Sequence, residues 1–201
     1  MAEDARLPAP SKLAPEHQMT IEEFLAFTDS RPDEEKWELI EGMPVVSPSP
    51  TDVHQLIVAS ITGYLWRHKV QSGALWFVLS GTGTRVPASK NSLPQPDIIV
   101  KESAAIGTPV TNEAVVIFEV LSRSNTAADR AWRRRVYTSV PNCQHYVTIS
   151  MVAPQILVYD RAQNWKERII DSLAEALDLP ALGLAMPLAD VYRWTPLGSP
   201  V

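Results

Sequence analysis

Two acidic side chains stand in stretches of sequence that are otherwise apolar. Asp97 lies in QPDIIV and Glu119 in VVIFEVLS, and both stretches have the composition of buried strands. An unpaired carboxylate is costly to bury, so each acid needs a cation, several hydrogen-bond donors or a metal ion. A third acid, Glu38 or Glu41, is available from the segment WELIEG. Two or three carboxylates that meet at the edge of a sheet would form an oxygen-ligand site suited to Mg²⁺ or Mn²⁺.

Such a site has a defined chemistry. A bound divalent ion lowers the pKa of a water ligand and stabilises negative charge on a phosphoryl group during in-line displacement. The simpler interpretation is that each acid ends a strand or pairs with a cation, and for either residue alone this is the commoner case. The spacing between Asp97 and Glu119 has no geometric meaning by itself, so the residues alone leave both interpretations open.

A dense basic cluster follows the second acidic strand. It lies on a predicted helix that Asn125 or Thr126 can cap, with Asp129 in the first turn. A net charge of −5 argues against a protein that coats nucleic acid non-specifically, but metal-binding carboxylates would themselves contribute to that charge. The local basic face therefore keeps a DNA-binding function open. It comprises Arg130, Arg133, Arg134 and Arg135.

Length and composition predict a single domain. The chain has 201 residues, of which 45% are hydrophobic and 20% charged, which is enough apolar material for one ordinary core. Residues 1–18 are rich in proline and lack periodicity, so we predict a mobile tail there and one domain over residues 19–201. No apolar run is long enough to span a membrane, and the N-terminus lacks the apolar region of a secretory signal. The single cysteine, Cys143, excludes an internal disulfide. We therefore expect a cytoplasmic protein.

The predicted elements that must position the acids alternate between helices and strands. A helix begins near Met19 with a Thr20–Glu23 capping box, and a hairpin over residues 36–48 turns at Glu41 and Gly42. The following pattern predicts a helix over 54–70, two short strands in 74–87, strands over 95–101 and 114–122, the basic helix, and strands over 144–150, 155–161 and 165–170. Residues 179–194 are predicted to pack back as loops and a short helix. This order indicates an α/β or α+β domain with one mixed sheet flanked by helices.

The order of the motifs resembles that of one bacterial family. WELIEG is followed by HQ at a helix start, then PDIIV, then FEVLSRSN, then an aspartate, a basic residue and a tyrosine at a spacing of four. From Met19 to Trp194 this set resembles the restriction endonuclease-like domain family within the PD-(D/E)XK nuclease superfamily. The resemblance implies a mixed sheet with helices on both sides and an active site where two adjacent strands diverge. It implies endonucleolytic hydrolysis of DNA phosphodiester bonds with Mg²⁺ or Mn²⁺.

The same resemblance implies roles for single residues. Asp97 matches the aspartate of the PD motif and Glu119 the acid of the (D/E)XK motif, so both are implied metal ligands. Glu38 matches an additional acid near the N-terminus and is the third implied ligand. His54 matches the histidine that opens the first long helix, and is implied to line the cleft. Without the resemblance, a packing or helix-start role for His54 would be equally acceptable.

The lysine of the superfamily is where this sequence departs. Apolar residues follow Glu119, and the helix position at which the family carries a lysine holds Arg133, between Asp129 and Tyr137 on one helix face. Arginine stays protonated, so Arg133 can stabilise a transition state but cannot act as a base. Its planar head prefers bidentate carboxylate contacts. It could therefore bridge Glu119 or Asp97 and occupy the place of the metal, which would weaken or abolish catalysis.

Two other functions compete with the nuclease. A catalytically degenerate nuclease fold with a binding or regulatory role would explain both Arg133 and the acidic net charge. A purely structural protein is the third hypothesis, because residues 145–161 are strongly β-forming and could pair as edge strands across a homodimer.

Overall fold

The computed structural model describes residues 18–32, 35–102, 107, 110–122 and 125–198. The predicted mobile tail falls almost entirely on residues 1–17, which lie outside the described residues, so that tail and the domain boundary remain predictions. None of the helices formed by the described residues combines the length and the hydropathy that a membrane span requires.

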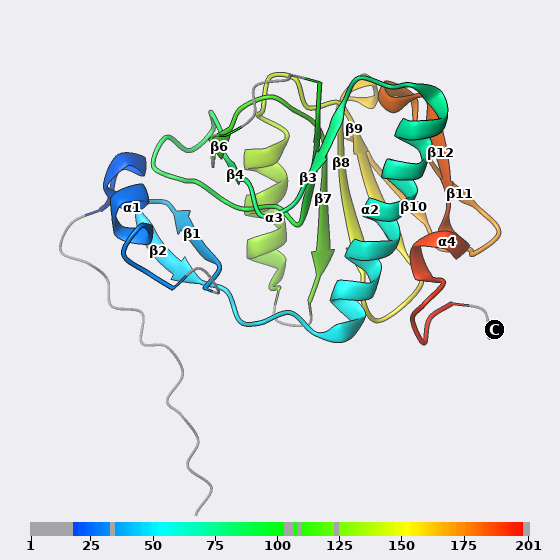
Figure 1. Ribbon diagram of the computed structural model, residues 1–201, viewed down its shortest axis with the longest axis horizontal. Coiled ribbons are helices and arrows are strands. Elements are labelled where there is room, and N and C mark those ends of the chain that lie inside the picture. Colours follow the sequence, from blue (N-terminus) through cyan, green and yellow to red (C-terminus); the bar gives the residue numbers. More distant parts are fainter. Residues whose placement is uncertain (1–17, 33–34, 103–106, 108–109, 123–124, 199–201) are drawn as a thin grey trace, which may run out of the picture.

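A six-stranded mixed sheet forms the centre of the molecule (Figure 1). Its strand order is β10-β9-β8-β7-β5-β3, and every neighbouring pair is antiparallel except β7 and β8. A parallel pair needs a crossover connection, and helix α3 supplies it between β7 and β8. The predicted mixed sheet is therefore confirmed. Its strands are β3 (Phe77–Leu79), β5 (Ile98–Lys101), β7 (Ala114–Leu121), β8 (His145–Ser150), β9 (Ile156–Asp160) and β10 (Glu167–Ile170).

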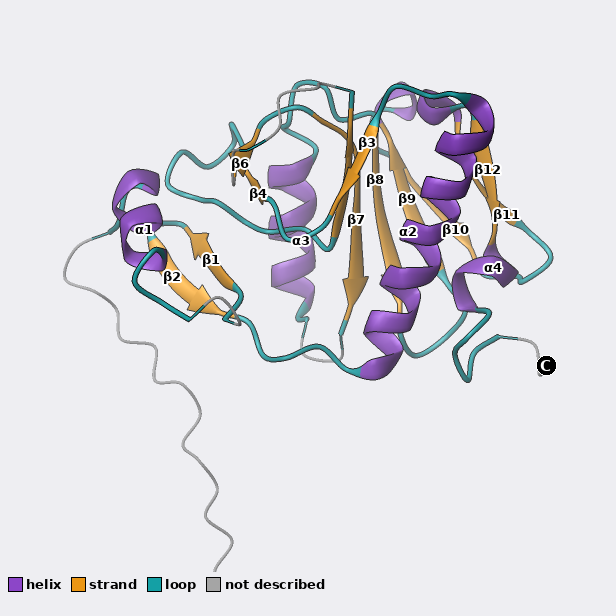
Figure 2. Ribbon diagram, viewed as in Figure 1, coloured by secondary structure: helices purple, strands orange, loops and turns teal. Residues whose placement is uncertain are grey.

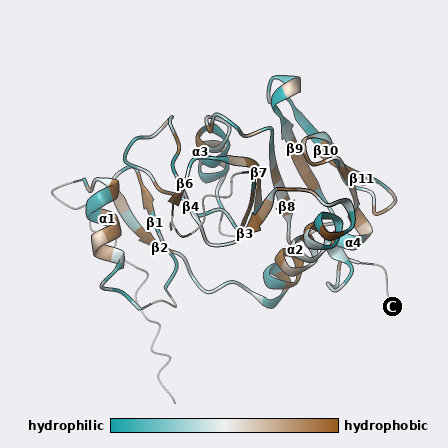
Figure 3. Cartoon of the chain, turned by 45° about the horizontal axis from the view of Figure 1, so that its top comes forward, coloured by the Kyte–Doolittle hydropathy of each residue, from teal (hydrophilic) through white to brown (hydrophobic). Residues whose placement is uncertain are grey.

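Helices cover both faces of this sheet (Figure 2). Helices α2 (Asp52–Ser72) and α4 (Leu188–Tyr192) pack on one face, and α3 (Ala127–Tyr137) packs on the other. Successive side chains of a strand point to opposite faces. Accordingly Ile98 and Phe118 join the core under α2, while Ile99 and Ile117 join the core under α3. Figure 3 shows the contrast between the hydrophobic β7 and the largely hydrophilic α3.

An N-terminal lobe lies on the side of the sheet that α3 covers (Figure 1). The predicted capping box is present, since Thr20 and Glu23 exchange hydrogen bonds. The predicted hairpin turn is confirmed by left-handed backbone at Glu41 (φ 50°) and Gly42 (φ 81°). A side chain at Gly42 would also collide with Gln18. The lobe contains α1 (Ile21–Thr28), β1 (Trp37–Ile40) and β2 (Met43–Val46), and a small parallel pair, β4 (Gly83–Thr84) and β6 (Val110–Thr111), lies next to it.

The structure corrects two predictions. Residues 179–194 are not only loops and a short helix, because a hairpin of β11 (Ala176–Leu179) and β12 (Leu184–Pro187) buries alternating side chains in the α2 core. The short 3-10 helix η2 (Pro180–Leu182) and Gly183 make its turn. The prediction of two short strands within residues 74–87 is confirmed by β3 and β4, which belong to different sheets. Finally, β8 and β9 each have two neighbours in the sheet, so the prediction that residues 145–161 pair as free edge strands is wrong.

Candidate active site

Strands β5 and β7 bring the two predicted acids together. Ile98 pairs with Phe118, and continuing this antiparallel register by one residue places Asp97 opposite Glu119. Both acids occupy positions that alternate with residues of the α2 core, so both face α3. A direct bond joins the two motifs, because the backbone N–H of Val120 donates to Asp97 Oδ2 at 2.8 Å. The sequence separation of Asp97 and Glu119 had no geometric meaning by itself, but the strand register places the two acids opposite each other at the end of adjacent strands.

Glu119 is a buried acid with partners on only one of its oxygens. The Tyr137 hydroxyl donates to Glu119 Oε1 at 2.7 Å, and Arg133 Nη1 donates to the same atom at 3.0 Å. None of the described residues donates a hydrogen bond to Oε2. Burial raises the pKa of Glu119 to about 7, although the positive charge of Arg133 acts in the opposite direction. This carboxyl group therefore changes charge near neutral pH.

Arg133 binds Glu38 in a bidentate pair and connects it to Glu119. Its Nη1 and Nη2 donate to the two oxygens of Glu38 at 3.1 and 2.7 Å. The backbone N–H of Gln95 adds a bond of 2.8 Å to Glu38 Oε1. Burial opposes ionisation of Glu38, but Arg133 and Gln95 outweigh it and hold the pKa of Glu38 below its ordinary value. The expected arginine bridge is present, and it joins Glu119 to Glu38 rather than to Asp97.

Asp97 has its own set of donors. His54 Nε2 lies 3.2 Å from Asp97 Oδ2, and Lys36 Nζ donates to Oδ1 at 3.3 Å. Burial opposes ionisation of Asp97, but the His54 hydrogen bond and the charge of Lys36 lower its pKa below the ordinary value. His54 reaches this position from the first turn of α2, where Thr51 caps the helix. Lys36 reaches it from the residue before β1.

All five predicted site residues line one pocket of about 660 Å³. The pocket lies among the ends of β5 and β7, the β1–β2 hairpin, the start of α2 and helix α3. Sequence reasoning missed Lys36, although its alternation with Glu38 could have indicated that both side chains point the same way. Glu41, the alternative third acid, lies outside the pocket and pairs with Arg135 at 3.2 Å. The predicted residues in the pocket are Glu38, His54, Asp97, Glu119 and Arg133.

The donor set fits a divalent ion held by two carboxylates. In the described part of the chain, no three His, Cys, Asp or Glu side chains are arranged to hold a metal ion together. Both oxygens of Glu38 accept from Arg133, which removes Glu38 from the available ligands in this arrangement. Asp97 and Glu119 remain, and Mg²⁺ is commonly bound by one or two carboxylates together with water and substrate phosphate. The chemistry of these two residues is compatible with Mg²⁺ or Mn²⁺.

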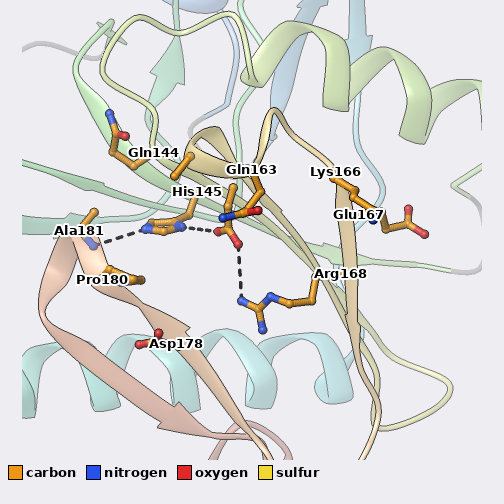
Figure 4. Close-up of a pocket in the computed structure, with 11 residues that line it drawn as sticks. Gln144, His145, Gln163, Lys166, Glu167, Arg168, Asp178, Pro180 and Ala181 are labelled. Atoms are coloured by element: carbon orange, nitrogen blue, oxygen red, sulfur yellow. Dashed lines mark hydrogen bonds and ion pairs between the residues drawn. The ribbon is translucent and has the colours of Figure 1, made fainter.

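A second pocket, of about 740 Å³, lies near the start of β8 (Figure 4). His145 Nδ1 lies 2.6 Å from Asp160, and the other oxygen of Asp160 lies 3.6 Å from Arg168. The backbone N–H of Ala181 points to His145 Nε2 at 3.4 Å. None of the predicted site residues lines this pocket. The polar groups at its centre form hydrogen bonds and ion pairs with one another. We therefore interpret them as a structural network next to the β11–β12 hairpin.

One family model matches most of this chain. A family model named Uma2 and described as "Putative restriction endonuclease" matches residues 21–189. A protein of Synechocystis sp. (strain PCC 6803), named "Uncharacterized protein slr1290", is 23% identical over 187 residues, covering 92% of this chain and 97% of that protein.

A solved structure shares the fold. It is described as a "putative nuclease belonging to DUF820" from Anabaena variabilis, and it superimposes with a TM-score of 0.70 over 88% of this chain and 98% of that one. The sequence identity is 16%, so this likeness concerns the architecture.

Proposed function

This chain belongs to the restriction endonuclease-like Uma2 family, and from that premise we propose that it is a Mg²⁺- or Mn²⁺-dependent endonuclease that hydrolyses DNA phosphodiester bonds. One observation carries the proposal: Asp97 and Glu119, 22 residues apart in sequence, meet at the end of adjacent strands and line one open pocket. Two facing carboxylates that could hold a divalent ion, with a guanidinium beside them, suit phosphoryl chemistry.

The residues of the pocket have different roles in the proposed reaction. Asp97 and Glu119 would hold the ion, which when bound would activate water and neutralise charge on the phosphate. The imidazole of His54 and the N–H of Val120 fix the orientation of the Asp97 carboxylate. Tyr137 fixes Oε1 of Glu119 through its hydroxyl, leaving Oε2 for other contacts.

Arg133 contributes charge and not proton transfer. Burial opposes its charged form, but the negative charges of Glu119 and Glu38 outweigh burial and hold the pKa of Arg133 above its ordinary value. A group that never deprotonates can attract a phosphate or stabilise its transition state, but it cannot take a proton from water. Glu38, with a lowered pKa, is a positioning residue that holds Arg133 by two bonds.

A second candidate function is a nuclease fold that binds DNA without cutting it. The observation that favours it is the arginine bridge itself, because the guanidinium bonded to Glu38 and Glu119 competes with a metal ion for Glu119. In this candidate the family fold is retained and the ion is excluded.

Cleavage of supercoiled plasmid and of single-stranded DNA, in Mg²⁺ and in Mn²⁺, separates the two candidates. The proposal expects metal-dependent nicking by the wild type, loss of nicking in Asp97→Ala and Glu119→Gln, and retention in Asp178→Asn. Asp178 is a suitable control because it is an exposed acid of the second pocket.

Wild-type activity no higher than that of Asp97→Ala, in either metal, would overturn the proposal. If Arg133→Lys then gains metal-dependent cleavage that the wild type lacks, the non-cleaving candidate is the correct one. A homodimer and a cytoplasmic location stay predictions that size-exclusion chromatography with light scattering and cell fractionation would check.

A further inference from the structure

Lys36 is a cation of the pocket that the family motifs do not include. The backbone N–H of Ser47 donates to its carbonyl at 2.8 Å, which extends the β1–β2 ladder by one residue beyond the Trp37–Val46 pair. Trp37 turns its ring to the other side, edge-on to Phe27 with centroids 5.1 Å apart. The backbone therefore directs Lys36 into the pocket, where its ammonium group lies 3.3 Å from Asp97 Oδ1.

Lys36 and Arg133 differ in how fully they are engaged. Arg133 donates four hydrogen bonds to Glu38, Glu119 and Tyr137, and only 16% of its side chain is exposed. Moving its guanidinium toward a ligand would leave two buried carboxylates without their cation.

Lys36 is freer to meet a ligand, since 36% of its side chain is exposed and it forms one ion pair with the residues that the structure describes. An ammonium group has three donors on a flexible stem. It can keep one bond to Asp97 and offer the others to a phosphate oxygen that enters the pocket. No buried acid loses its partner when it does so.

We infer that Lys36, and not Arg133, is the residue that binds the DNA phosphate next to Asp97. This inference rests on the proposed function, because it names the group that would hold the substrate at the same site. Lys36 is then a catalytic residue in the sense that it contacts the reacting phosphate. Arg133 stays bonded to Glu119 and Glu38 and acts on the phosphate through its charge, without contacting it.

The test compares Lys36→Gln, Lys36→Arg and the control Lys166→Gln. Lys166 is an exposed lysine of the second pocket, so its loss removes the same charge at a different place. Binding of a short fluorescent DNA duplex is measured by anisotropy without divalent ions at several salt concentrations, and cleavage is measured separately in Mg²⁺.

Removal of one phosphate contact is expected to make the negative slope of the logarithm of the association constant against the logarithm of salt concentration shallower by about 0.9. The affinity is expected to fall by about tenfold. Lys36→Gln should show both changes, together with at least a tenfold loss of cleavage rate at saturating DNA. Lys36→Arg should recover most of the affinity, and Lys166→Gln should match the wild type.

The binding measurement keeps this inference separate from the proposed function. If the wild type does not cleave, the proposed hydrolysis fails, yet a reduced salt slope in Lys36→Gln still supports the phosphate contact. Wild-type affinity, slope and rate in Lys36→Gln would overturn the inference. Circular dichroism melting checks that the variant is folded, and Lys36→Met, which keeps the aliphatic stem, replaces it if it is not.

Discussion

Replacing Arg133 by methionine is the sharpest test of the site's electrostatics. The side chain keeps a similar length but loses every donor, so Glu38 loses two charged hydrogen bonds and Glu119 loses one. Removing one partner of a buried ion pair usually costs about 3–5 kcal/mol, because a charge is left uncompensated. Counting the lost hydrogen bonds separately, at about 1.5–3 kcal/mol each, would give a larger loss of stability. We expect the lower range, because Glu119 already has a pKa of about 7 and can take up a proton instead.

The neighbouring Arg135 provides a matched control on the same helix. It pairs with Glu41 of the same hairpin, but 54% of Arg135 and 58% of Glu41 are exposed. An exposed pair contributes about 0–1 kcal/mol. Arg135→Met should therefore destabilise the protein by no more than about 1 kcal/mol.

Urea unfolding measured at pH 5 and pH 8 makes the comparison. In Arg133→Met, buried Glu38 and Glu119 lack a cation, so their folded-state pKa values lie above the unfolded ones. Stability from such groups is present at low pH and is lost as pH rises through the folded values. The difference from wild type should be smaller at pH 5 than at pH 8. A loss no larger than that of Arg135→Met, or one that does not grow with pH, would refute the assignment of Arg133 as the cation of two buried acids.

Two further predictions concern stability. Glu119 has a folded pKa of about 7 against an ordinary value of 4.5, so its contribution to stability is present below about pH 4.5 and is lost as pH rises through 7. Urea unfolding across this range should show that the free energy of unfolding falls by up to about 3 kcal/mol, and Glu119→Gln should abolish this pH dependence. An identical pH profile in both proteins would contradict the raised pKa. Thr126→Ala removes the cap that exchanges hydrogen bonds with Asp129 at the start of α3 and should cost about 1 kcal/mol, whereas Thr138→Ala, at the far end of the helix, should cost no more than about 0.5 kcal/mol. Equal losses in the two threonine variants would argue against the cap.

The elements with strong local signals were predictable from sequence. The Thr20 capping box, the Glu41–Gly42 turn and the unbroken apolar run around Glu119 each specify their own conformation, and all three occur as predicted. The restriction endonuclease-like resemblance is likewise confirmed by the family model. The β11–β12 hairpin was missed because its strands have four residues each, and only packing against the α2 core distinguishes them from loop.

The arrangement of the site depends on contacts that no local pattern encodes. From the sequence, Arg133 could pair with either Glu119 or Asp97. In the structure it pairs with Glu119 and with Glu38, which lies 95 residues away in the β1–β2 hairpin. Asp97 is instead satisfied by His54 and Lys36, which arrive from α2 and from the residue before β1. Which cation meets which acid is a property of how three elements dock, so residue types alone could not assign the pairs.

These pairings set the charge of the pocket and connect it to the proposed reaction. Glu38 and Asp97 have lowered pKa values and are ionised at neutral pH, and Arg133 and Lys36 balance them. Asp52 adds a further carboxylate to the lining of the pocket. While the imidazole beside Asp97 is neutral, the pocket therefore carries one negative charge when Glu119 holds its proton and two when it does not. Of Glu38, Asp97 and Glu119, it is thus Glu119 whose charge changes near pH 7. Under the proposed function, a divalent ion and a proton compete for Glu119. Arg133 cannot deprotonate, so its positive charge in the pocket stays constant over the same pH range.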